Sequence, residues 1–325
     1  MIDTARVKDI LVVRNDRFGE FLLNIPAMRA IKEAYPGALL TLAVRPEVKE
    51  LAECVEYADR IVIWDDNFRK ALGKQKFDIC VILNPTKEAH WLSFWSGIPN
   101  RVGYNRKWGI LLTHKMADNK ALGLRHEVEY NLDLAGLIGA KTNDKSIILG
   151  KLPLDTNPDY LGAIAVHPYT SDSLKQWPVE RFVELAKRIA QGWGQSPMGT
   201  VPFKAKVVFV GKIEDRENRG LSPQLVPEGE GTVPGYIDLI NRTSLVELAQ
   251  ILKQCRLLIS CDSGPMHLAA AVGTPVLALF RNDLAGKSAK RWGPWGEGHI
   301  VIEKASLEDI SVEEVLDKLK NIRYS

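Results

Sequence analysis

The sequence lacks several features that would place it in common protein classes. Its four cysteines, Cys54, Cys80, Cys255 and Cys261, show no CxxC pair and no zinc-binding spacing, so no disulfide framework is expected. The longest mostly apolar run, Leu268 to Phe280, has 13 residues, whereas a membrane-spanning helix needs roughly 20. The apolar run near the N-terminus is too short for a secretion signal. We therefore expect a cytoplasmic protein with reduced, buried cysteines.

Motifs of several enzyme classes are also missing. No GxGxxG follows the first strand expected in either half, and no GxSxG or GxxxxGK[ST] sequence occurs, which weighs against a nicotinamide dehydrogenase, an esterase and a P-loop NTPase. The six histidines show no HxxxH or HxH arrangement. We therefore expect no metal site and no cofactor.

The residues that are present indicate an α/β protein. Of 325 residues, 46% are hydrophobic and 26% are charged, which is typical of folded soluble proteins. Short apolar runs alternate with longer amphipathic stretches, which predicts parallel sheets covered by helices. The expected strands cover residues 10–13, 39–44, 60–64, 77–83, 163–166, 206–210, 256–260 and 275–279. The expected helices include residues 20–34, 179–190, 244–254, 265–272 and 307–319.

A segment rich in turn-forming residues, 150–158, separates two similar series of these elements. It has two prolines and no apolar periodicity, so it is the best candidate for a linker. We expect two doubly wound domains, residues 1–156 and 157–325, with a cleft between the carboxyl ends of their sheets. Ligands of such folds bind in the loops that follow the strands.

Six basic residues between Arg101 and Arg125 face only Asp118 along the sequence. They indicate an anionic partner for the first half, although a solvated loop with scattered basic residues explains them equally well. No nucleic-acid-binding motif accompanies them, so we expect no nucleic acid partner. Trp91 and Trp95, four residues apart on an expected helix, suit core packing better than a lipid-facing stripe.

The first candidate loop, residues 14–20, follows the first strand and contains Asp16, Gly19 and Glu20. A carboxylate here lies at the start of a helix, whose dipole favours the ionised form that a general base must have. Acidic residues at such positions also serve simply as helix caps. The spacing alone therefore leaves both roles open.

The second loop, residues 167–178, combines the adjacent hydroxyls of Thr170 and Ser171 with Lys175 and a Trp-Pro helix start. Hydroxyl donors and a lysine suit a phosphate, although a polar loop with an incidental lysine has the same pattern. The third loop, residues 260–267, is more specific. A strand ends, Ser263 and Gly264 follow, and a helix begins with Pro265. The free N–H groups of such a terminus can bind a diphosphate.

Together these loops resemble the ADP-heptose:lipopolysaccharide heptosyltransferases, glycosyltransferase family 9, whose fold is of the GT-B type. The most specific block is the strand followed by DSGPMHLAA, and the Lys-x-Trp-Pro block is moderately specific. Further matching text runs from ILVVRNDRFGEFLLNIPAM at the start through GIPNRVGYNRKWGILLTHK in the middle. The resemblance implies two Rossmann-like domains, of which the first binds the acceptor and the second binds the nucleotide sugar. It further implies an inverting, metal-independent transfer of heptose from ADP-heptose to the inner core of lipopolysaccharide.

The resemblance also implies roles for individual residues. Those expected to bind the donor are Thr170, Ser171, Lys175, Glu214, Asp262, Ser263, Gly264 and His267. Glu20 stands where the family usually has an aspartate as the catalytic base, and its side chain is one methylene longer. That difference shifts its reach by roughly 1 Å, so Asp16 is kept as a second candidate. The segment 280–283 departs from the family's Gly-Pro-Thr.

The acceptor expected from the resemblance is an anionic glycolipid. We expect Arg17, Arg101, Arg106 and Lys107 to meet it, with peripheral contact to the cytosolic face of the inner membrane. Two alternatives stay open at this point. One is transfer of another sugar from another nucleotide, and the other is a protein that binds a nucleotide sugar without catalysis.

Overall fold

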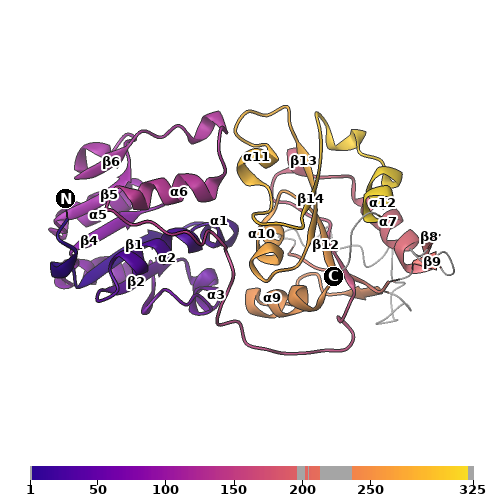
Figure 1. Ribbon diagram of the computed structural model, residues 1–325, viewed down its shortest axis with the longest axis horizontal. Coiled ribbons are helices and arrows are strands. Elements are labelled where there is room, and N and C mark those ends of the chain that lie inside the picture. Colours follow the sequence, from indigo (N-terminus) through magenta and orange to yellow (C-terminus); the bar gives the residue numbers. More distant parts are fainter. Residues whose placement is uncertain (1, 196–201, 204, 213–235, 321–325) are drawn as a thin grey trace. The chain divides into compact units, whose positions relative to one another are not determined.

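The structure is a computed structural model that describes residues 2–195, 202–203, 205–212 and 236–320. The chain divides into two compact units, Met1–Leu152 and Pro153–Ser325, so that the division falls after Leu152 rather than after residue 156. Each unit is built around a six-stranded parallel sheet (Figure 1).

The sheet of the first unit has the strand order β3-β2-β1-β4-β5-β6, and all neighbouring strands are parallel. Its strands are β1 (Asp9–Arg14), β2 (Leu39–Val44), β3 (Arg60–Ile63), β4 (Ile79–Ile82), β5 (Asn100–Tyr104) and β6 (His114–Met116). The first four are the strands that the sequence predicts. The strands β5 and β6 are not predicted, because β5 begins with polar residues and β6 is a short edge strand without an apolar run.

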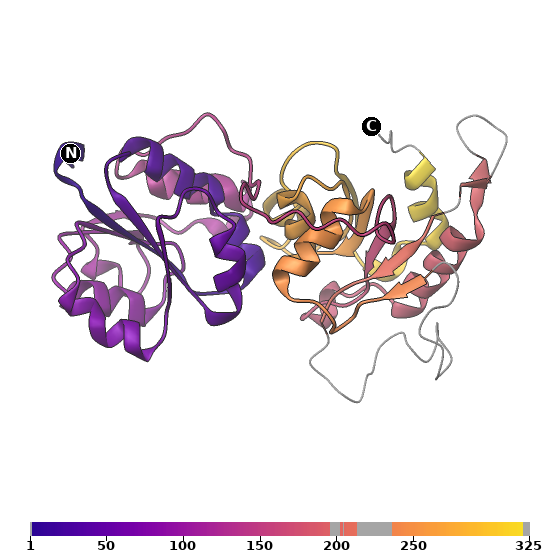
Figure 2. The ribbon, with the colours of Figure 1, turned by 90° about the horizontal axis from the view of Figure 1, so that it is seen from below.

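Helices cover both faces of this sheet. They are α1 (Phe18–Leu22), α2 (Ile25–Ala34), α3 (Lys49–Glu53), α4 (Asp66–Ala71), α5 (Lys87–Trp95) and α6 (Glu127–Gly136). Figure 2 shows the sheet between α2 and α6 on one side and α4 and α5 on the other. Leu11 and Val13 of β1 pack with Trp64 and Phe68 on the α4–α5 side.

The prediction of one helix over residues 20–34 is wrong, because the chain forms α1 and α2 with a break between them. Pro26 is the physical reason. A proline inside a helix lacks the N–H group, and its ring would clash with the carbonyl of Leu22, four residues earlier. In the structure Pro26 lies in the first turn of α2, where it is tolerated. The Asn24 side chain donates a hydrogen bond of 2.5 Å to the carbonyl of Glu20.

The sheet of the second unit repeats the same order, β11-β10-β7-β12-β13-β14, again with parallel neighbours. Its strands are β7 (Ile164–His167), β10 (Val207–Phe209), β11 (Tyr236–Asp238), β12 (Leu257–Cys261), β13 (Val276–Arg281) and β14 (Ile300–Lys304). A separate antiparallel pair joins β8 (Trp193–Gln195) and β9 (Pro202–Phe203). Both units are thus doubly wound and Rossmann-like, which confirms the predicted fold class for each.

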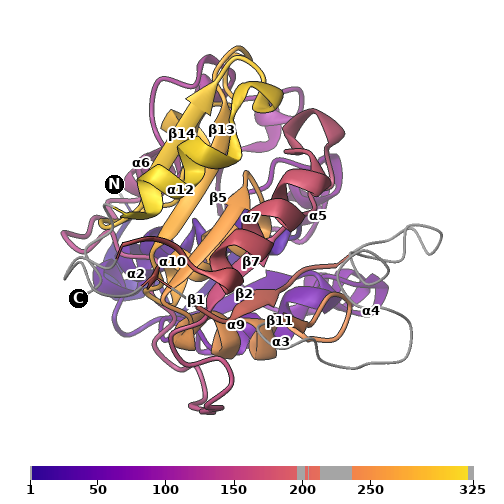
Figure 3. The same ribbon diagram turned by 90° about the vertical axis from the view of Figure 1, so that its right-hand side faces the viewer.

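The helices of the second unit are α7 (Val179–Gln191), α9 (Leu245–Gln254), α10 (Gly264–Ala271), α11 (Ala289–Trp292) and α12 (Val312–Lys320). The helices α7 and α12 contact each other, as do α9 and α10 (Figure 3). The last helix begins five residues later than predicted, since residues 307–309 form a separate 3₁₀ turn.

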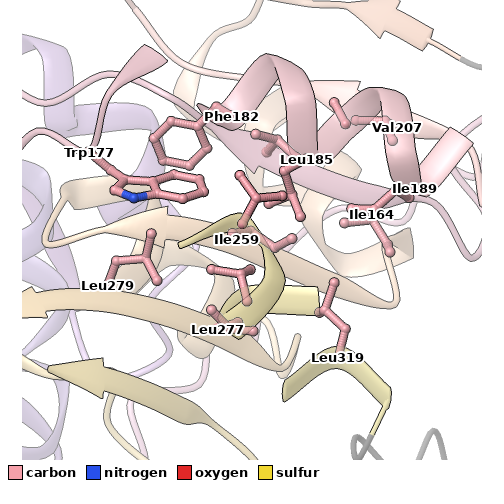
Figure 4. Close-up of a cluster of buried hydrophobic side chains, with 14 of the residues drawn as sticks. Ile164, Trp177, Phe182, Leu185, Ile189, Val207, Ile259, Leu277, Leu279 and Leu319 are labelled. Carbon is pink, nitrogen blue, oxygen red and sulfur yellow. The ribbon is translucent and has the colours of Figure 1, made fainter. Parts of the chain in front are cut away.

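A large hydrophobic core lies between the second sheet and the helices α7 and α12 (Figure 4). The Trp177 ring is fully buried and meets Phe182 edge to face, with 4.7 Å between the ring centroids. Its indole N–H donates a 3.0 Å hydrogen bond to the carbonyl of Ile310. The Trp-Pro motif after Lys175 is therefore an anchor, because it ties the end of the second candidate loop to the core.

The four cysteines are buried and free, as predicted. Burial raises the pKa of the Cys80, Cys255 and Cys261 thiols to about 12, so these groups stay neutral at physiological pH. In the described part of the chain no helix combines the length and the apolar character needed to cross a bilayer.

The prediction for the tryptophans of α5 is only half right. Trp91 is partly buried against Trp108, with 6.0 Å between the ring centroids. Trp95 is 75% exposed, so the prediction that it packs in the core is wrong. The periodicity places both residues near one helix face, but Trp95 is the last residue of α5 and extends past the layer that covers Trp91.

Candidate functional site

The three predicted loops lie at comparable positions of the two sheets. In each unit the strand order reverses beside the first strand, between β1 and β4 and between β7 and β12. Doubly wound sheets bind ligands at this point, outside the carboxyl ends of the strands. The predicted loops follow β1, β7 and β12, and each therefore borders such a point.

The loop after β7 is held in shape by the side chain of Gln176. Its Oε1 accepts a 2.9 Å hydrogen bond from the backbone N–H of Thr170, and its Nε2 donates to the carbonyls of Pro168 and Trp177. The Thr170 hydroxyl donates a 2.7 Å hydrogen bond to the carbonyl of Asp172. The loop is thus preorganised, and sequence reasoning assigned no role to the glutamine that braces it.

Lys175 and Asp262 form an ion pair that joins the loop after β7 to the loop after β12. Their side chains are only 24% and 11% exposed. Burial raises the pKa of Asp262 more than the nearby Lys175 lowers it. The resemblance gives these residues separate roles, at the diphosphate and at the sugar, and the structure brings the two together.

The helix α10 begins directly beside this ion pair. Ser263 is its N-cap residue with extended backbone, and Gly264 and Pro265 are its first residues. The first N–H groups of a helix have no partner within the helix, and with its dipole they favour an anion. His267 lies on the first turns of α10 and is buried. The Lys175 side chain and the N-terminus of α10 therefore lie together at the carboxyl ends of β7 and β12.

A chain of hydrogen bonds leads from the interior to this helix start. His167, the last residue of β7, places its Nδ1 at 3.1 Å from the hydroxyl of Ser260 in β12. The Ser260 hydroxyl lies 2.8 Å from that of Ser263. Burial lowers the pKa of His167 to about 4, so the ring is neutral at physiological pH. A signal for Ser260 and His167 was present in the sequence. Both are polar residues near the ends of apolar strands, and they occupy paired positions of β12 and β7.

The segment that departs from the family pattern supports the same loops. Arg281 makes two hydrogen bonds, 2.9 and 2.6 Å long, with the carboxylate of Asp283. The same guanidinium donates a 3.2 Å hydrogen bond to the carbonyl of Leu174, next to Lys175. Lys287 lies 3.6 Å from Asp172. The altered segment is therefore a brace for the loop after β7.

In the first unit Arg14 links the loops after β1 and β4. Its side chain is buried and donates a 3.0 Å hydrogen bond to the carbonyl of Leu83. Its Nε lies 2.7 Å from Oδ1 of Asp16. Asn84 donates a 3.1 Å hydrogen bond to the side chain of Asn15. Asp16 is thus part of the brace that shapes this loop.

Glu20 lies in the first turn of α1, three residues beyond its N-cap. Burial raises its pKa, and the negative charge of Asp16 raises it further. Burial also raises the pKa of Asp16, against the attraction of Arg14. Two partly buried carboxyl groups whose charges repel each other therefore share this loop. Of the two, Asp16 is engaged by Arg14.

The predicted basic stretch is more balanced in space than along the sequence. Arg106 pairs with Asp118, and Arg125 pairs with Asp133. Lys120 is buried, with its Nζ 2.5 Å from Glu127. In space these cations therefore meet further carboxylates, because α6 supplies Glu127 and Asp133 from outside residues 101–125. The anionic partner of this stretch stays a prediction.

The Lys120 ion pair lies close enough to the β1 loop to influence its carboxyl groups. Glu127 raises the pKa of Asp16, and Lys120 lowers it. The Lys120 Nζ also lies 3.3 Å from the side-chain oxygen of Asn131 and 4.3 Å from the centre of the Tyr104 ring. Sequence reasoning did not identify this buried ion pair.

The other residues predicted to bind the glycolipid acceptor are exposed or donate hydrogen bonds to backbone carbonyls. Arg101 donates a 2.7 Å hydrogen bond to the carbonyl of Leu111, whereas Arg17 and Lys107 are exposed. Their role with an acceptor stays a prediction. Glu214 lies outside the described residues. Within the described ranges no group of three His, Cys, Asp or Glu side chains could hold a metal ion.

A family model and curated relatives identify the family of the chain. The family model described as glycosyltransferase family 9 (heptosyltransferase) matches residues 66–320. Lipopolysaccharide heptosyltransferase 2 of Salmonella typhimurium is 22% identical, over 96% of this chain and 98% of that protein.

Two solved structures share the fold along nearly the whole chain. A glycosyl transferase family 9 protein from Veillonella parvula has a TM-score of 0.78 at 21% identity, over 97% of both chains. The Escherichia coli ADP-heptose lipopolysaccharide heptosyltransferase II has a TM-score of 0.77 at 20% identity, over 97% of this chain and 98% of that one.

Proposed function

The chain belongs to glycosyltransferase family 9, and from this premise we propose that it transfers heptose from ADP-heptose to a hydroxyl group of the lipopolysaccharide inner core. The names of the Salmonella and Escherichia coli relatives support this choice of donor sugar and acceptor. The observation that carries the proposal is that Lys175, Asp262 and the start of α10 lie together at the carboxyl ends of β7 and β12.

The second unit supplies the chemistry that a nucleotide diphosphate requires. Lys175 provides a positive charge, and α10 provides backbone N–H donors next to Ser263. The loop that carries Lys175 is held by hydrogen bonds of Gln176 and Trp177. Preorganised donors of this kind stabilise the charge that develops on a leaving group. In the proposed complex Asp262, which accepts from Lys175, binds hydroxyl groups of the sugar beside the diphosphate.

The first unit supplies the proton acceptor. Glu20 takes the proton of the acceptor hydroxyl as that oxygen attacks the anomeric carbon of the heptose. The bond from the anomeric carbon to the phosphate oxygen breaks, and ADP leaves with the electron pair. The product carries the inverted configuration, because attack and departure occur on opposite faces. A raised pKa suits Glu20 to this task, since a base is most effective when its pKa lies near the working pH.

Lysine and backbone donors can neutralise the leaving ADP, so the proposed mechanism uses no divalent cation. Addition of EDTA should therefore leave the rate unchanged. A strict requirement for a divalent ion would contradict this part of the proposal.

A related transferase reaction with another nucleotide sugar is the second candidate. It is favoured by the segment at Arg281, which differs from the family pattern and contacts the loop after β7. The motifs of the loops after β7 and β12 indicate the diphosphate of the donor more clearly than they indicate its sugar.

One experiment tests both candidates. The purified protein is given ADP-heptose and rival nucleotide sugars, each with defined lipopolysaccharide core acceptors, and the products are identified by mass spectrometry. We expect one added heptose from ADP-heptose alone. Transfer from a rival donor favours the second candidate, and donor binding without any product contradicts both.

A further inference from the structure

The end of α5 carries an unusual concentration of exposed apolar side chains. Trp95 is 75% exposed and Phe94 is 45% exposed, and Ile110 on the neighbouring 3₁₀ turn (Gly109–Leu111) is 85% exposed. Phe94 and Trp95 are the exposed aromatic residues among the side chains that the structure describes. Exposure of large aromatic rings is costly in water, and contiguous apolar patches commonly mark interaction sites.

These residues lie close together in the first unit. The Trp91 ring lies 6.2 Å from that of Trp95 and 6.0 Å from that of Trp108, and Phe94 meets Trp95 edge to face at 6.5 Å. The turn that carries Ile110 contacts α5 directly. We refer to Trp91, Phe94, Trp95, Trp108 and Ile110 as the aromatic surface.

The side chain of Arg101 ties together the segments that carry the aromatic surface. It donates to the carbonyls of Leu111, in the turn, and of Ile98, just beyond the end of α5. Its backbone N–H donates a 2.7 Å hydrogen bond to the hydroxyl of Thr113. The surface is therefore preformed and does not depend on a flexible loop.

Cations border this surface. Lys87 and Lys107 lie over the Trp108 ring, with 5.2 and 5.8 Å between each Nζ and the ring centre. The Arg101 guanidinium lies 5.4 Å from the centre of the Phe94 ring. The acidic residue of α5, Glu88, is engaged elsewhere, by Arg69 and by the indole N–H of Trp64 at 2.9 Å. The border is therefore basic, with apolar rings between the cations.

We propose that the aromatic surface docks on a lipid bilayer that contains anionic headgroups. Tryptophan and phenylalanine partition into the boundary between headgroups and acyl chains, and nearby lysines and arginines are attracted by anionic lipids. The purpose of this docking rests on the proposed function, since a glycolipid acceptor lies in a membrane, but the surface itself is independent of the chemistry.

A second copy of the chain fits this surface less well than a bilayer does. In a two-fold contact the same patch meets itself, so the cations at its border, Lys87, Lys107 and Arg101, would be brought into one interface with those of the other copy. Like charges brought together at an interface oppose association. An anionic bilayer instead neutralises all of these cations while it buries the rings.

The test is sedimentation of the full chain with vesicles. Two compositions are compared, phosphatidylcholine alone and phosphatidylcholine mixed with phosphatidylglycerol. We expect binding to the mixed vesicles that weakens with added salt, and a shift of the tryptophan emission to shorter wavelength on binding. The variant Phe94→Ala/Trp95→Ala should bind about tenfold more weakly or not at all. The variant Lys87→Gln/Lys107→Gln should lose most of the preference for anionic vesicles.

Matched controls separate docking from misfolding and from catalysis. Leu154→Ala/Leu161→Ala removes two comparably exposed side chains, 81% and 75% exposed, from the second unit and should bind as the unmodified protein does. Thermal melting verifies that each variant folds. Equal vesicle binding by the aromatic variant contradicts the proposal, as does dimerisation that Trp95→Ala abolishes. The rate of transfer to an acceptor without a lipid anchor should be the same in the Phe94→Ala/Trp95→Ala variant and the unmodified protein. The vesicle assay does not depend on transfer, so it still tests docking if no transfer is found.

Discussion

The two units share one strand order but carry opposite chemistry at the point where that order reverses. Beside β1 lie two partly buried carboxyl groups, Asp16 and Glu20, whose pKa values are raised. Beside β7 lie Lys175 and the N-terminus of α10, which favour an anion. The backbone topology is the same in both cases, so the difference comes from a few loop residues. The sheet provides the same position in both units, and the loop residues determine whether that position carries carboxyl groups or a cation beside a helix N-terminus.

Replacement of Glu20 tests the proton-accepting side and should have the largest effect. Glu20→Gln keeps the shape of the side chain and removes the base, so kcat should fall by roughly a hundredfold or more while ADP affinity is unchanged. The same variant should melt about 2 °C higher at neutral pH, because a buried charge near Asp16 is removed. Turnover numbers, ADP titration and thermal melting measure these changes.

Asp16→Asn is the matched control for that experiment. Because Asp16 contacts Arg14 and shapes the loop, its replacement should reduce turnover less than Glu20→Gln does. If Glu20→Gln keeps most of its turnover and Asp16→Asn abolishes it, Asp16 is the base.

Replacement of Lys175 tests the anion-binding side. Lys175→Ala should weaken ADP binding by roughly ten- to a hundredfold, since a charged hydrogen bond to the diphosphate is lost. Calorimetric titration with ADP measures the change.

The variant also leaves Asp262 buried without its cation, so Lys175→Ala/Asp262→Asn is needed to separate this effect from the loss of phosphate contact. The double variant should still bind weakly. Lys287→Ala, which alters an exposed lysine 3.6 Å from Asp172, should bind ADP nearly as well as the unmodified protein. Full ADP affinity in both Lys175 variants would show that the lysine does not contact the diphosphate.

The hydrogen-bond chain behind α10 should contribute a smaller effect. Ser260→Ala removes the hydroxyl between His167 and Ser263, so the Ser263 hydroxyl is no longer oriented. We expect about fivefold weaker ADP binding. Ser263→Ala should have a similar effect, and the double variant should be little worse than either, because both act on one contact. Ser173→Ala, at an exposed position of the neighbouring loop, serves as the control. If the losses of ADP affinity multiply in the double variant, the two hydroxyl groups act independently, which contradicts a hydrogen-bond chain.

The pH dependence of stability distinguishes the two sites more finely. Burial raises the pKa values of Asp16, Glu20 and Asp262, so the folded protein holds these protons more tightly than the unfolded chain. Their contribution to the unfolding free energy is therefore complete below about pH 4 and is lost as pH rises through the raised values. His167, with its pKa lowered to about 4, acts in the opposite sense. Its contribution is present above about pH 6.5 and is lost as pH falls toward 4.

A comparison with Glu20→Gln isolates one of these groups. At about pH 4 both proteins carry an uncharged group at position 20, so their melting temperatures should agree closely. As the pH rises through the raised pKa of Glu20, the unmodified protein loses stability that the variant keeps, so the variant should melt increasingly higher. A difference that does not grow with pH shows that the Glu20 pKa is not raised.

Much of the fold was predictable from the sequence, because buried parallel strands are short apolar runs that alternate with helices. The features that were missed have local physical causes. Pro26 interrupts a helix whose apolar spacing continues through it, and β6 is a polar edge strand that carries no periodic signal. The exposure of Trp95 depends on where α5 ends, which periodicity does not report.

The candidate site was predictable only loop by loop. The positions of Lys175 and Asp262 after their strands follow from the sequence, but their ion pair depends on the adjacency of β7 and β12. The pair of Lys120 with Glu127 is closer in sequence, but it depends on how the turn at Lys120 lies against α6. Contacts between segments far apart in sequence require the register of the sheet, and a single sequence does not supply it.

The most direct test is a crystal structure of the protein grown with ADP. The diphosphate should lie at the first turn of α10, with an oxygen within hydrogen-bond distance of the Lys175 ammonium group and of the Ser263 hydroxyl. A nucleotide bound away from that helix start, with Lys175 still paired only to Asp262, would contradict the account.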